Sequence, residues 1–212
     1  MDVPVRLEGF HALKHALRFG AEILAAEGDL GDLPDQLAPD VAERMHALVR
    51  GGGDVVATAR RPAVDVAAML AAPGPVVLLE NPRHLGNLGA CVRVAAAAGA
   101  AGVLTTGDRD PWHPEALRGS AGLHFAVPVA RVDGVPAARD RPLVAIDPDG
   151  DGDAPIPAQA LLAFGSERHG LSCALLAAAD ARVRIPMRPG VSSLNLATAV
   201  AAVLYGGRLR EG

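Results

Sequence analysis

The chain has 212 residues, and half of them (50%) are hydrophobic, which provides for a sizeable core in one or two small domains and excludes a disordered or fibrous protein. No apolar run reaches the roughly 18 residues that a membrane-spanning helix needs, and the first residues lack the basic start and apolar stretch of a signal peptide. We therefore expect a soluble protein that stays in the cytoplasm.

The net charge of −4 is unfavourable for a protein that binds nucleic acid, because phosphate groups are neutralised by lysine and arginine. The basic residues are nevertheless nearly all arginine, whose planar fork suits phosphate, and Lys14 is the single lysine. A local basic face on an acidic protein is therefore compatible with the composition. The arginines near glycine-rich segments are Arg83, Arg93, Arg118, Arg168, Arg184 and Arg188.

The two cysteines, Cys91 and Cys173, stand in apolar surroundings and lack the spacing of metal ligands. We expect buried, reduced thiols rather than a disulfide or a zinc site.

The first part of the chain, residues 1–72, has the pattern of a small α/β domain. The glycine run Gly51–Gly53 predicts a turn within it, and Ala71–Pro75 predicts the linker that follows. The expected elements are a helix at Gly9–Phe19, a strand at Ala21–Ala26, a helix at Asp40–Val49, a strand at Asp54–Thr58 and a helix at Val64–Leu70.

The second part, residues 75–210, alternates short apolar runs with alanine-rich helical stretches, which predicts a mainly parallel sheet flanked by helices. The expected strands are Val76–Leu79, Gly102–Thr105, Phe125–Val129, Leu143–Ile146, Leu161–Phe164 and Val183–Pro186. The expected helices are Ala90–Ala98, Pro114–Arg118, Cys173–Ala178 and Leu194–Tyr205.

Three polar or glycine-containing segments follow predicted strands, at the strand ends where parallel α/β sheets bind ligands. The first, Glu80–Arg93, has Asn87 as a plausible helix N-cap, and Arg93 lies where it can point back toward the strand ends. Taken alone, this segment favours the simpler explanation that Arg93 extends from a helix into solvent. The segment lacks the glycine spacing of a dinucleotide-binding loop.

The second segment, Leu161–Ser172, would present Glu167 at the end of a strand, after a glycine, Gly165, that lets a ligand approach the backbone. A serine hydrolase is excluded because the G-x-S-x-G nucleophile elbow is absent. An ordinary polar loop remains the alternative.

The third segment, Arg184–Ala199, is a strand, a proline/glycine loop and a helix of small residues. Its polar residues Ser192, Ser193 and Asn195 could cap that helix or touch a ligand, and capping alone would explain the serines.

Taken together, the three segments resemble the signature motifs of the SpoU/TrmH family of RNA 2′-O-ribose methyltransferases in the SPOUT superfamily. The matching patterns are N-x-G-x-x-x-R, G-x-E-x-x-G-L, and I-P-M with S-L-N downstream, and they extend from about Pro75 to Arg210. His84-Leu85 stands where Asp-Pro is frequent in the family. The segment Leu7–Leu13 resembles the start of the small RNA-binding domain that many members carry, here truncated.

The resemblance implies an α/β fold whose C-terminal segment forms a trefoil knot, a feature that the rarity of knots would argue against. It also implies S-adenosyl-L-methionine as cofactor, tRNA or rRNA as partner, and a homodimer with the active site at the subunit interface. The implied catalytic positions are Asn87, Arg93, Glu167, Ser193 and Asn195, and the implied cofactor-binding positions are Gly165, Ile185, Met187 and Leu194.

In the implied mechanism, a ribose 2′-oxygen attacks the methyl group in line without a covalent enzyme intermediate. Because arginine titrates above roughly 12, we expect Arg93 to stabilise the developing alkoxide and the adjacent phosphate rather than to act as a base. Glu167 would hold Arg93 and the loop, while Ser193 and Asn195 orient the ribose.

The acidic run Asp147–Asp153 imitates the first half of a calcium-binding loop, but Ala158 stands where a bidentate glutamate is required. A solvated acidic turn is the better interpretation, and no metal is expected. The rival functions are an RNA-binding protein that kept the fold but lost catalysis, and a nicotinamide-dependent oxidoreductase. The first should have lost Arg93, Glu167 or Asn195, and the second needs a glycine fingerprint that is absent.

Overall fold

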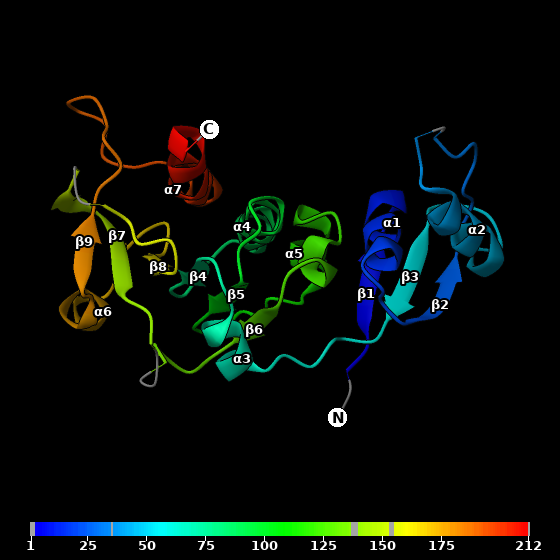
Figure 1. Ribbon diagram of the computed structural model, residues 1–212. Coiled ribbons are helices and arrows are strands. Elements are labelled where there is room, and N and C mark those ends of the chain that lie inside the picture. Colours follow the sequence, from blue (N-terminus) through cyan, green and yellow to red (C-terminus); the bar gives the residue numbers. More distant parts are fainter. Residues whose placement is uncertain (1–2, 35, 137–139, 153–154, 212) are drawn as a thin grey trace.

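A computed structural model describes residues 3–34, 36–136, 140–152 and 155–211, with side chains described up to residue 206. The molecule is elongated, with two lobes that are each built on a sheet of their own (Figure 1). Among the described residues, no helix is long and apolar enough to cross a membrane.

The first lobe is a three-stranded antiparallel sheet in the order β1-β3-β2, covered by helices α1 and α2. The sequence pattern predicted both helices and the strands β2 and β3, but it missed β1, a strand of four residues placed directly before a helix. The bounds are β1 Val5–Glu8, α1 Phe10–Arg18, β2 Ile23–Glu27, α2 Pro39–Leu48 and β3 Val56–Ala59.

The second lobe is a six-stranded sheet in the order β6-β5-β4-β8-β7-β9, and all its strand pairs are parallel. The predicted mainly parallel α/β fold is confirmed. The central strands β5, β4 and β8 are buried at every position, as expected for a parallel sheet covered on both faces. The bounds are β4 Val76–Leu79, β5 Gly102–Thr105, β6 Val129–Arg131, β7 Leu143–Asp151, β8 Leu161–Phe164 and β9 Ala181–Val183.

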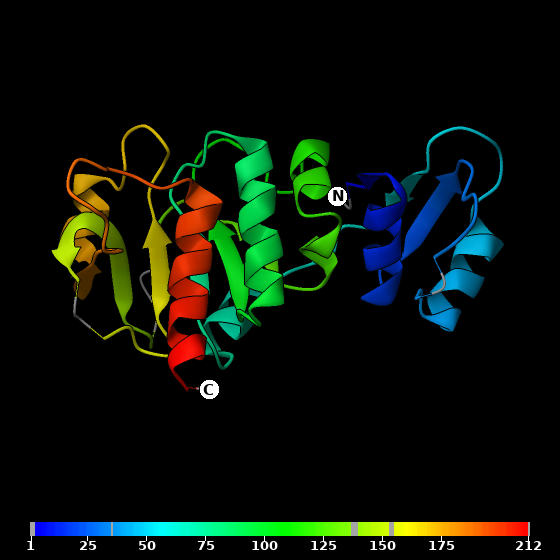
Figure 2. The ribbon, with the colours of Figure 1, turned by 90° about the horizontal axis from the view of Figure 1, so that it is seen from above.

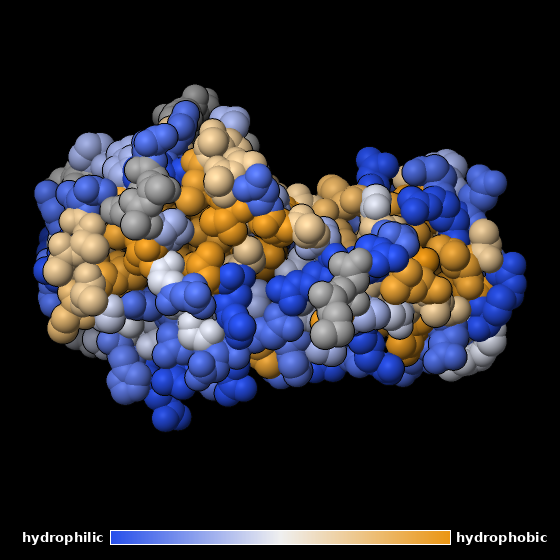
Figure 3. Space-filling view, turned by 90° about the horizontal axis from the view of Figure 1, so that it is seen from below, coloured by the Kyte–Doolittle hydropathy of each residue, from blue (hydrophilic) through white to orange (hydrophobic). Residues whose placement is uncertain are grey.

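Helices cover both faces of this sheet. Helices α4 and α7 lie side by side on one face, with α5 beside α4, while the short helices α3 and α6 lie on the other (Figures 1 and 2). Figure 3 looks at that second face and shows apolar residues gathered over the large lobe. The bounds are α3 Val66–Ala71, α4 Leu85–Ala97, α5 Pro114–Gly119, α6 Cys173–Ala178 and α7 Leu196–Glu211, with a 3-10 turn at Leu123–Phe125.

Close packing between α4 and α5 depends on a glycine. A Cβ atom at Gly89 would lie 2.1 Å from the carbonyl oxygen of Ala116, so a larger residue at this position would force the two helices apart.

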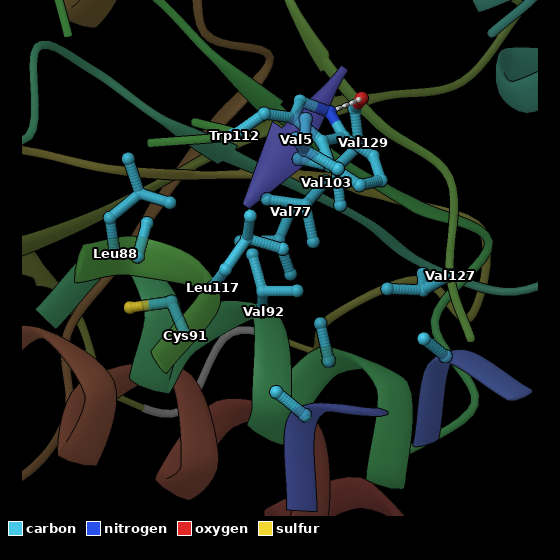
Figure 4. Close-up of a cluster of buried hydrophobic side chains, with 14 of the residues drawn as sticks. Val5, Val77, Leu88, Cys91, Val92, Val103, Trp112, Leu117, Val127 and Val129 are labelled. Atoms are coloured by element: carbon cyan, nitrogen blue, oxygen red, sulfur yellow. Dashed lines mark hydrogen bonds between the residues drawn. The ribbon is translucent and has the colours of Figure 1, made fainter. Parts of the chain in front are cut away.

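The hydrophobic core is continuous between the two lobes (Figure 4). Val5 of the first lobe belongs to the same cluster as Trp112, whose indole nitrogen donates to the carbonyl oxygen of Val129 at 3.0 Å. At the lobe boundary the His15 ring nitrogen Nδ1 donates to Ala121 O at 2.7 Å, and a Cβ at Gly122 would lie 2.4 Å from Ala12 O. The lobes are therefore packed on each other rather than joined only by a linker.

Tertiary pairing changes three of the predicted elements. The predicted strand Phe125–Val129 is wrong, because the 3-10 turn occupies its start and β6 begins at Val129. The predicted acidic turn is wrong as far as Asp151, because β7 continues through it and pairs with β9. There Asp147 forms an ion pair with Arg182. Strand β9 begins earlier than expected, at Ala181, and Asp153 lies outside the described residues.

Helix α3 packs on the second sheet although it precedes the predicted linker, since its Met69 and Leu70 belong to the cluster beneath that sheet. Buried Arg141 holds the end of this helix and the linker. It donates to Leu70 O and Ala72 O at 2.7 Å and to Gly74 O at 2.8 Å. The bond to Leu70 satisfies a carbonyl group that the helix end leaves without an intrahelical partner, and the other two hold the residues that follow the helix.

The two cysteines differ in environment. Cys91 is a buried free thiol on α4, as predicted, and burial raises its pKa. The prediction is wrong for Cys173, which is free but exposed, because it is the first residue of the short surface helix α6.

Candidate active site at the carboxyl ends of the strands

The loops after β5, β4 and β8 come together because these three strands are neighbours and parallel. All three therefore end at the same edge of the sheet, where α/β proteins bind their ligands. The loops after β4 and β8 contain the first two motifs found in the sequence.

A line of hydrogen bonds joins one residue from each motif. The side-chain nitrogen of Asn195 donates to Asn87 Oδ1 at 3.1 Å, and the side-chain nitrogen of Asn87 donates to Glu167 Oε1 at 3.0 Å. The other carboxylate oxygen of Glu167 accepts from the backbone nitrogen of Arg83 at 3.1 Å. Three segments that are far apart in sequence thus meet at Asn87, as the motif pattern predicted.

Glu167 is held as a carboxylate. Burial raises its pKa, but the hydrogen bond from Asn87 and those from backbone amides, including Arg83 and His84, together outweigh burial and leave the pKa below its ordinary value. The amides of Arg83 and His84 directly precede α4, where the helix dipole also favours a negative charge. An anion so engaged is suited to fixing geometry and is a weak proton acceptor.

The N-cap prediction for Asn87 is wrong. Helix α4 begins at Leu85, so Asn87 is already inside its first turn, and the N-cap residue His84 has no capping side-chain bond. The carboxylate of Glu167, from another loop, instead accepts from the Asn87 side chain and from the backbone nitrogen of Arg83 just before the helix, which no local pattern could reveal.

Asn195 instead acts as a cap, since its Oδ1 accepts from the backbone nitrogens of Ala197 at 3.0 Å and Thr198 at 3.3 Å, at the start of α7. The same side chain reaches Asn87, so the start of α7 is fixed relative to α4. One of the three polar residues proposed as caps therefore does both tasks, while Ser192 and Ser193 are exposed.

The loops are also bound to one another. Ser172 donates from its backbone nitrogen and from its hydroxyl to the two oxygens of Glu80, each at 2.6 Å. The backbone nitrogen of Asn81 donates to the Thr106 hydroxyl at 3.1 Å, and Asn81 itself has a left-handed backbone with φ of 49°. The three loops are therefore preorganised by bonds that tie each to a neighbour.

Arg93 lies apart from this network, contrary to the expectation that Glu167 holds it. Six residues after Asn87, it stands about 120° away around an ideal helix. Its side chain is exposed, its charge lowers the pKa of His15 on α1, and the described residues include no hydrogen-bond partner for it. The single chain does not bring this arginine to the Glu167 cluster.

The residues predicted to bind the cofactor lie mainly on the coil between β9 and α7. Ile185 and Met187 are half-buried, whereas Leu194 keeps 41% of its surface exposed. This coil rises above the sheet in Figure 1 before entering α7.

At Gly165 we expected a glycine so that a ligand could approach the backbone, but the structure shows that the loop itself requires it. A Cβ at this position would lie 2.1 Å from the carbonyl carbon of Gly170 and 2.3 Å from the nitrogen of Leu171. The loop after β8 folds back onto Gly165, so a side chain here would displace the loop itself rather than fill a ligand's space.

Sequence reasoning missed Arg109, which follows β5 and carries no motif. The fold places it beside the first two motif loops in a cavity of about 360 Å³. A basic residue just after a buried strand was the available signal, but only the strand order β5-β4-β8 brings it to the other loops.

Comparison with known proteins gives consistent matches. Residues 74–205 match the model of the SpoU rRNA Methylase family. The chain is 34% identical over 190 residues to the 23S rRNA (uridine(2479)-2′-O)-methyltransferase of Streptomyces viridochromogenes, covering 80% of this chain and 64% of that protein. It is also 34% identical over 207 residues to an uncharacterized tRNA/rRNA methyltransferase of Mycobacterium tuberculosis, covering 86% and 72%.

Among solved structures, the SpoU methyltransferase AviRb from Streptomyces viridochromogenes in complex with the cofactor AdoMet superposes with a TM-score of 0.79. The match has 27% identity and covers 98% of this chain and 90% of that one. The chain spans less than two thirds of the length of some curated relatives, 64% of the Streptomyces viridochromogenes enzyme and 53% of a Synechocystis homologue.

Proposed function

Because the chain belongs to the SpoU rRNA Methylase family, we propose that it transfers a methyl group from S-adenosyl-L-methionine to a ribose 2′-hydroxyl of RNA. The observation that carries the proposal is the hydrogen-bonded line Asn195–Asn87–Glu167, which assembles the three motif segments at one edge of the sheet. The relative named as a 23S rRNA 2′-O-methyltransferase supports the choice of the ribose oxygen. Such a substrate implies a cytoplasmic enzyme.

The residues proposed to hold the cofactor are Gly165, Ile185, Met187 and Leu194. Their chemistry fits an adenine ring, since the exposed apolar surface of Leu194 and the half-buried Ile185 offer it contacts. AviRb, a structural neighbour, is described in complex with AdoMet. When bound, this cofactor supplies an electrophilic methyl group. The trefoil knot of the C-terminal segment stays a prediction.

The protein's own part in the reaction is orientation and charge placement. Glu167, ionised and doubly engaged, fixes Asn87, and Asn87 fixes Asn195. We assign to Asn195 and Ser193 the orientation of the ribose, so that its 2′-oxygen approaches the methyl carbon in line. The bound cofactor would supply the methyl group to that oxygen, and the hydroxyl proton would leave to solvent or to the substrate's own phosphate. Arg93 stabilises the negative charge on that oxygen.

We also propose a homodimer, because Arg93 is needed at the reacting oxygen yet lies apart from the Glu167 cluster in the single chain. A second copy can bring its own Arg93 to the site. Val191, an apolar side chain exposed to 43% on the coil before α7, is one that such a partner would cover. Light scattering at micromolar concentration is expected to report a dimer, and a monomer alone would contradict it.

The test of the reaction is product chemistry. The protein is incubated with methyl-labelled S-adenosylmethionine and either 23S rRNA or bulk tRNA, and the RNA is then hydrolysed in alkali. A methylated 2′-oxygen cannot attack the neighbouring phosphate, so the label should survive in an alkali-stable dinucleotide. Label on a base with an alkali-labile ribose would overturn the reaction. Failure to bind the cofactor in calorimetry would favour an inactive RNA-binding protein instead.

A further inference from the structure

A basic cavity adjoins the Glu167 cluster and is not used by the proposed mechanism. It measures about 360 Å³ and is lined only by arginine and histidine: Arg83, His84, Arg109, Arg168 and His169. All five side chains are exposed, so the cavity is open to a large ligand. None of the residues assigned to the cofactor lines it.

Each of the three neighbouring strands contributes to this cavity. Arg83 and His84 follow β4, Arg109 follows β5, and Arg168 and His169 follow β8. Because the loops are tied together by the bonds of Glu80, Asn81 and Glu167, the cations are held close together before any ligand arrives. Placing like charges close together raises the free energy of the folded protein, and a bound anion would offset this repulsion.

Among the described residues, the arginines of the cavity have no carboxylate partner, in contrast to several arginines elsewhere. Arg60, Arg61 and Arg182 form ion pairs with Glu22, Asp110 and Asp147. Within the part of the chain that the structure describes, no such pair involves the three cavity arginines.

The acidic groups nearby leave the cavity positive. Both oxygens of Glu167 are engaged by Asn87 and the backbone of Arg83. Asp110 accepts from Arg61 and from the backbone of Trp112. Exposed Asp108 is adjacent to Arg109 in sequence, and the carboxylate of exposed Glu115 lies 4.0 Å from where a Cβ of Gly86 would stand, at the start of α4. The lining itself consists of three guanidinium groups and two imidazoles.

We propose that this cavity binds a backbone phosphodiester of the substrate RNA next to the ribose that is methylated. The inference rests on the proposed function and specifies which part of the RNA substrate the cavity binds. Arginine forks match phosphate oxygens, and all five lining residues are arginine or histidine, whose side chains can donate to those oxygens. Such contacts position the RNA without reading its sequence. The cavity therefore increases the affinity for RNA and fixes the position of the RNA strand at the edge of the sheet where the methyl group is transferred.

The test is a double variant, Arg109→Gln with Arg168→Gln, which removes two cavity charges and leaves the Glu167 network intact. Arg182→Gln is the control. Arg182 lies on the edge strand β9, and its charge is already paired with Asp147 of β7. Binding of 23S rRNA is measured at several salt concentrations, and S-adenosylmethionine binding is measured by calorimetry. Circular dichroism and thermal unfolding check that the fold is retained.

For the double variant we expect RNA affinity to fall about tenfold or more at low salt, and the slope of log K against log salt to shrink by about 1 to 2, as lost phosphate contacts predict. The KM for RNA should rise, the cofactor affinity should stay within about twofold, and the control should match the wild type. An unchanged salt slope would overturn the inference. A selective loss of cofactor affinity would also overturn it, because the cavity would then hold the cofactor's carboxylate.

This outcome is separable from that of the proposed function. If the wild-type protein binds RNA with a steep salt dependence but transfers no methyl group, the proposed function is wrong. The salt slopes of the variants would still test whether the cavity binds phosphate.

Discussion

Glu167 and Arg93 are charged residues from the same set of motifs, but only Glu167 is held in place by hydrogen bonds. Glu167 accepts hydrogen bonds on both oxygens and has a lowered pKa, whereas Arg93 is exposed and lies near the basic residues of α1. A residue that is held before the substrate arrives contributes orientation. One that has no bonded partner among the described residues is available to act in the proposed dimer.

If Arg93 acts mainly on the oxygen that develops negative charge, Arg93→Ala should lower the methylation rate by about 10²-fold or more and leave cofactor affinity nearly unchanged, because the lost interaction is made only at the barrier. Single-turnover rates and calorimetry measure the two quantities. Arg18→Ala, which removes an exposed charge from the end of α1, is the matched control. A fully active Arg93→Ala protein would remove Arg93 from the mechanism.

His124 gives a prediction for stability against pH. Its Nε2 donates to the carbonyl oxygen of Pro111 at 2.8 Å, its Nδ1 lies 2.7 Å from the Ser120 hydroxyl, and burial lowers its pKa to about 4. Below a pH of about 6.5 the unfolded chain binds a proton that the folded protein does not, so unfolding becomes easier as the pH falls. The free energy of unfolding should therefore decrease by up to about 3 kcal/mol between pH 6.5 and 4 through this residue.

Urea unfolding at a series of pH values measures this slope, and His124→Gln should flatten it. An NMR titration of the ring gives the same pKa without a variant. A ring that titrates near its ordinary value in the folded protein would contradict the prediction.

At the scale of elements, the sequence predicted what depends on local pattern. The strands Val76–Leu79, Gly102–Thr105 and Leu161–Phe164 were predicted with their correct bounds, because each is a short, continuously buried run. The extension of β7 through its acidic residues was missed, since it depends on pairing with β9 and on the ion pair from Arg182.

The candidate site was predictable to a similar extent. Asn87, Glu167 and Asn195 were predicted from the motif pattern, and the structure joins them by hydrogen bonds. Their local roles were not predictable, because the partner of the Asn87 side chain at the start of α4 is Glu167, a residue 80 positions later. The position of Arg109 depends on strand order, which the sequence does not reveal.

The end of α3 offers a test of one such long-range contact. Arg141→Met should lower the free energy of unfolding by about 2 to 4 kcal/mol, since three carbonyl groups near Leu70 lose a charged donor that comes from a distant part of the chain. Urea unfolding measures the loss. Arg60→Met, which breaks an exposed ion pair with Glu22, should cost less than about 1 kcal/mol. Equal losses in the two variants would mean that Arg141 does not hold the linker.

At the scale of the whole molecule, the position of Arg93 bears on whether one chain can form the proposed active site alone. The Glu167 cluster is complete within one chain, yet Arg93 lies on another side of α4 and has no bond to it among the described residues. If the proposed reaction needs both, the working site combines the cluster of one subunit with Arg93 of the other.

Mixing two inactive variants tests this directly. Arg93→Ala and Glu167→Gln proteins are unfolded together, refolded in equal amounts and assayed for methyl transfer. With random pairing, about half of the dimers contain one of each variant, and each of these has one site with neither substitution. The mixture should therefore recover about a quarter of the wild-type activity, although each variant refolded alone stays inactive. If Arg93 acted within its own chain, every site in the mixture would carry a substitution, and no activity would return.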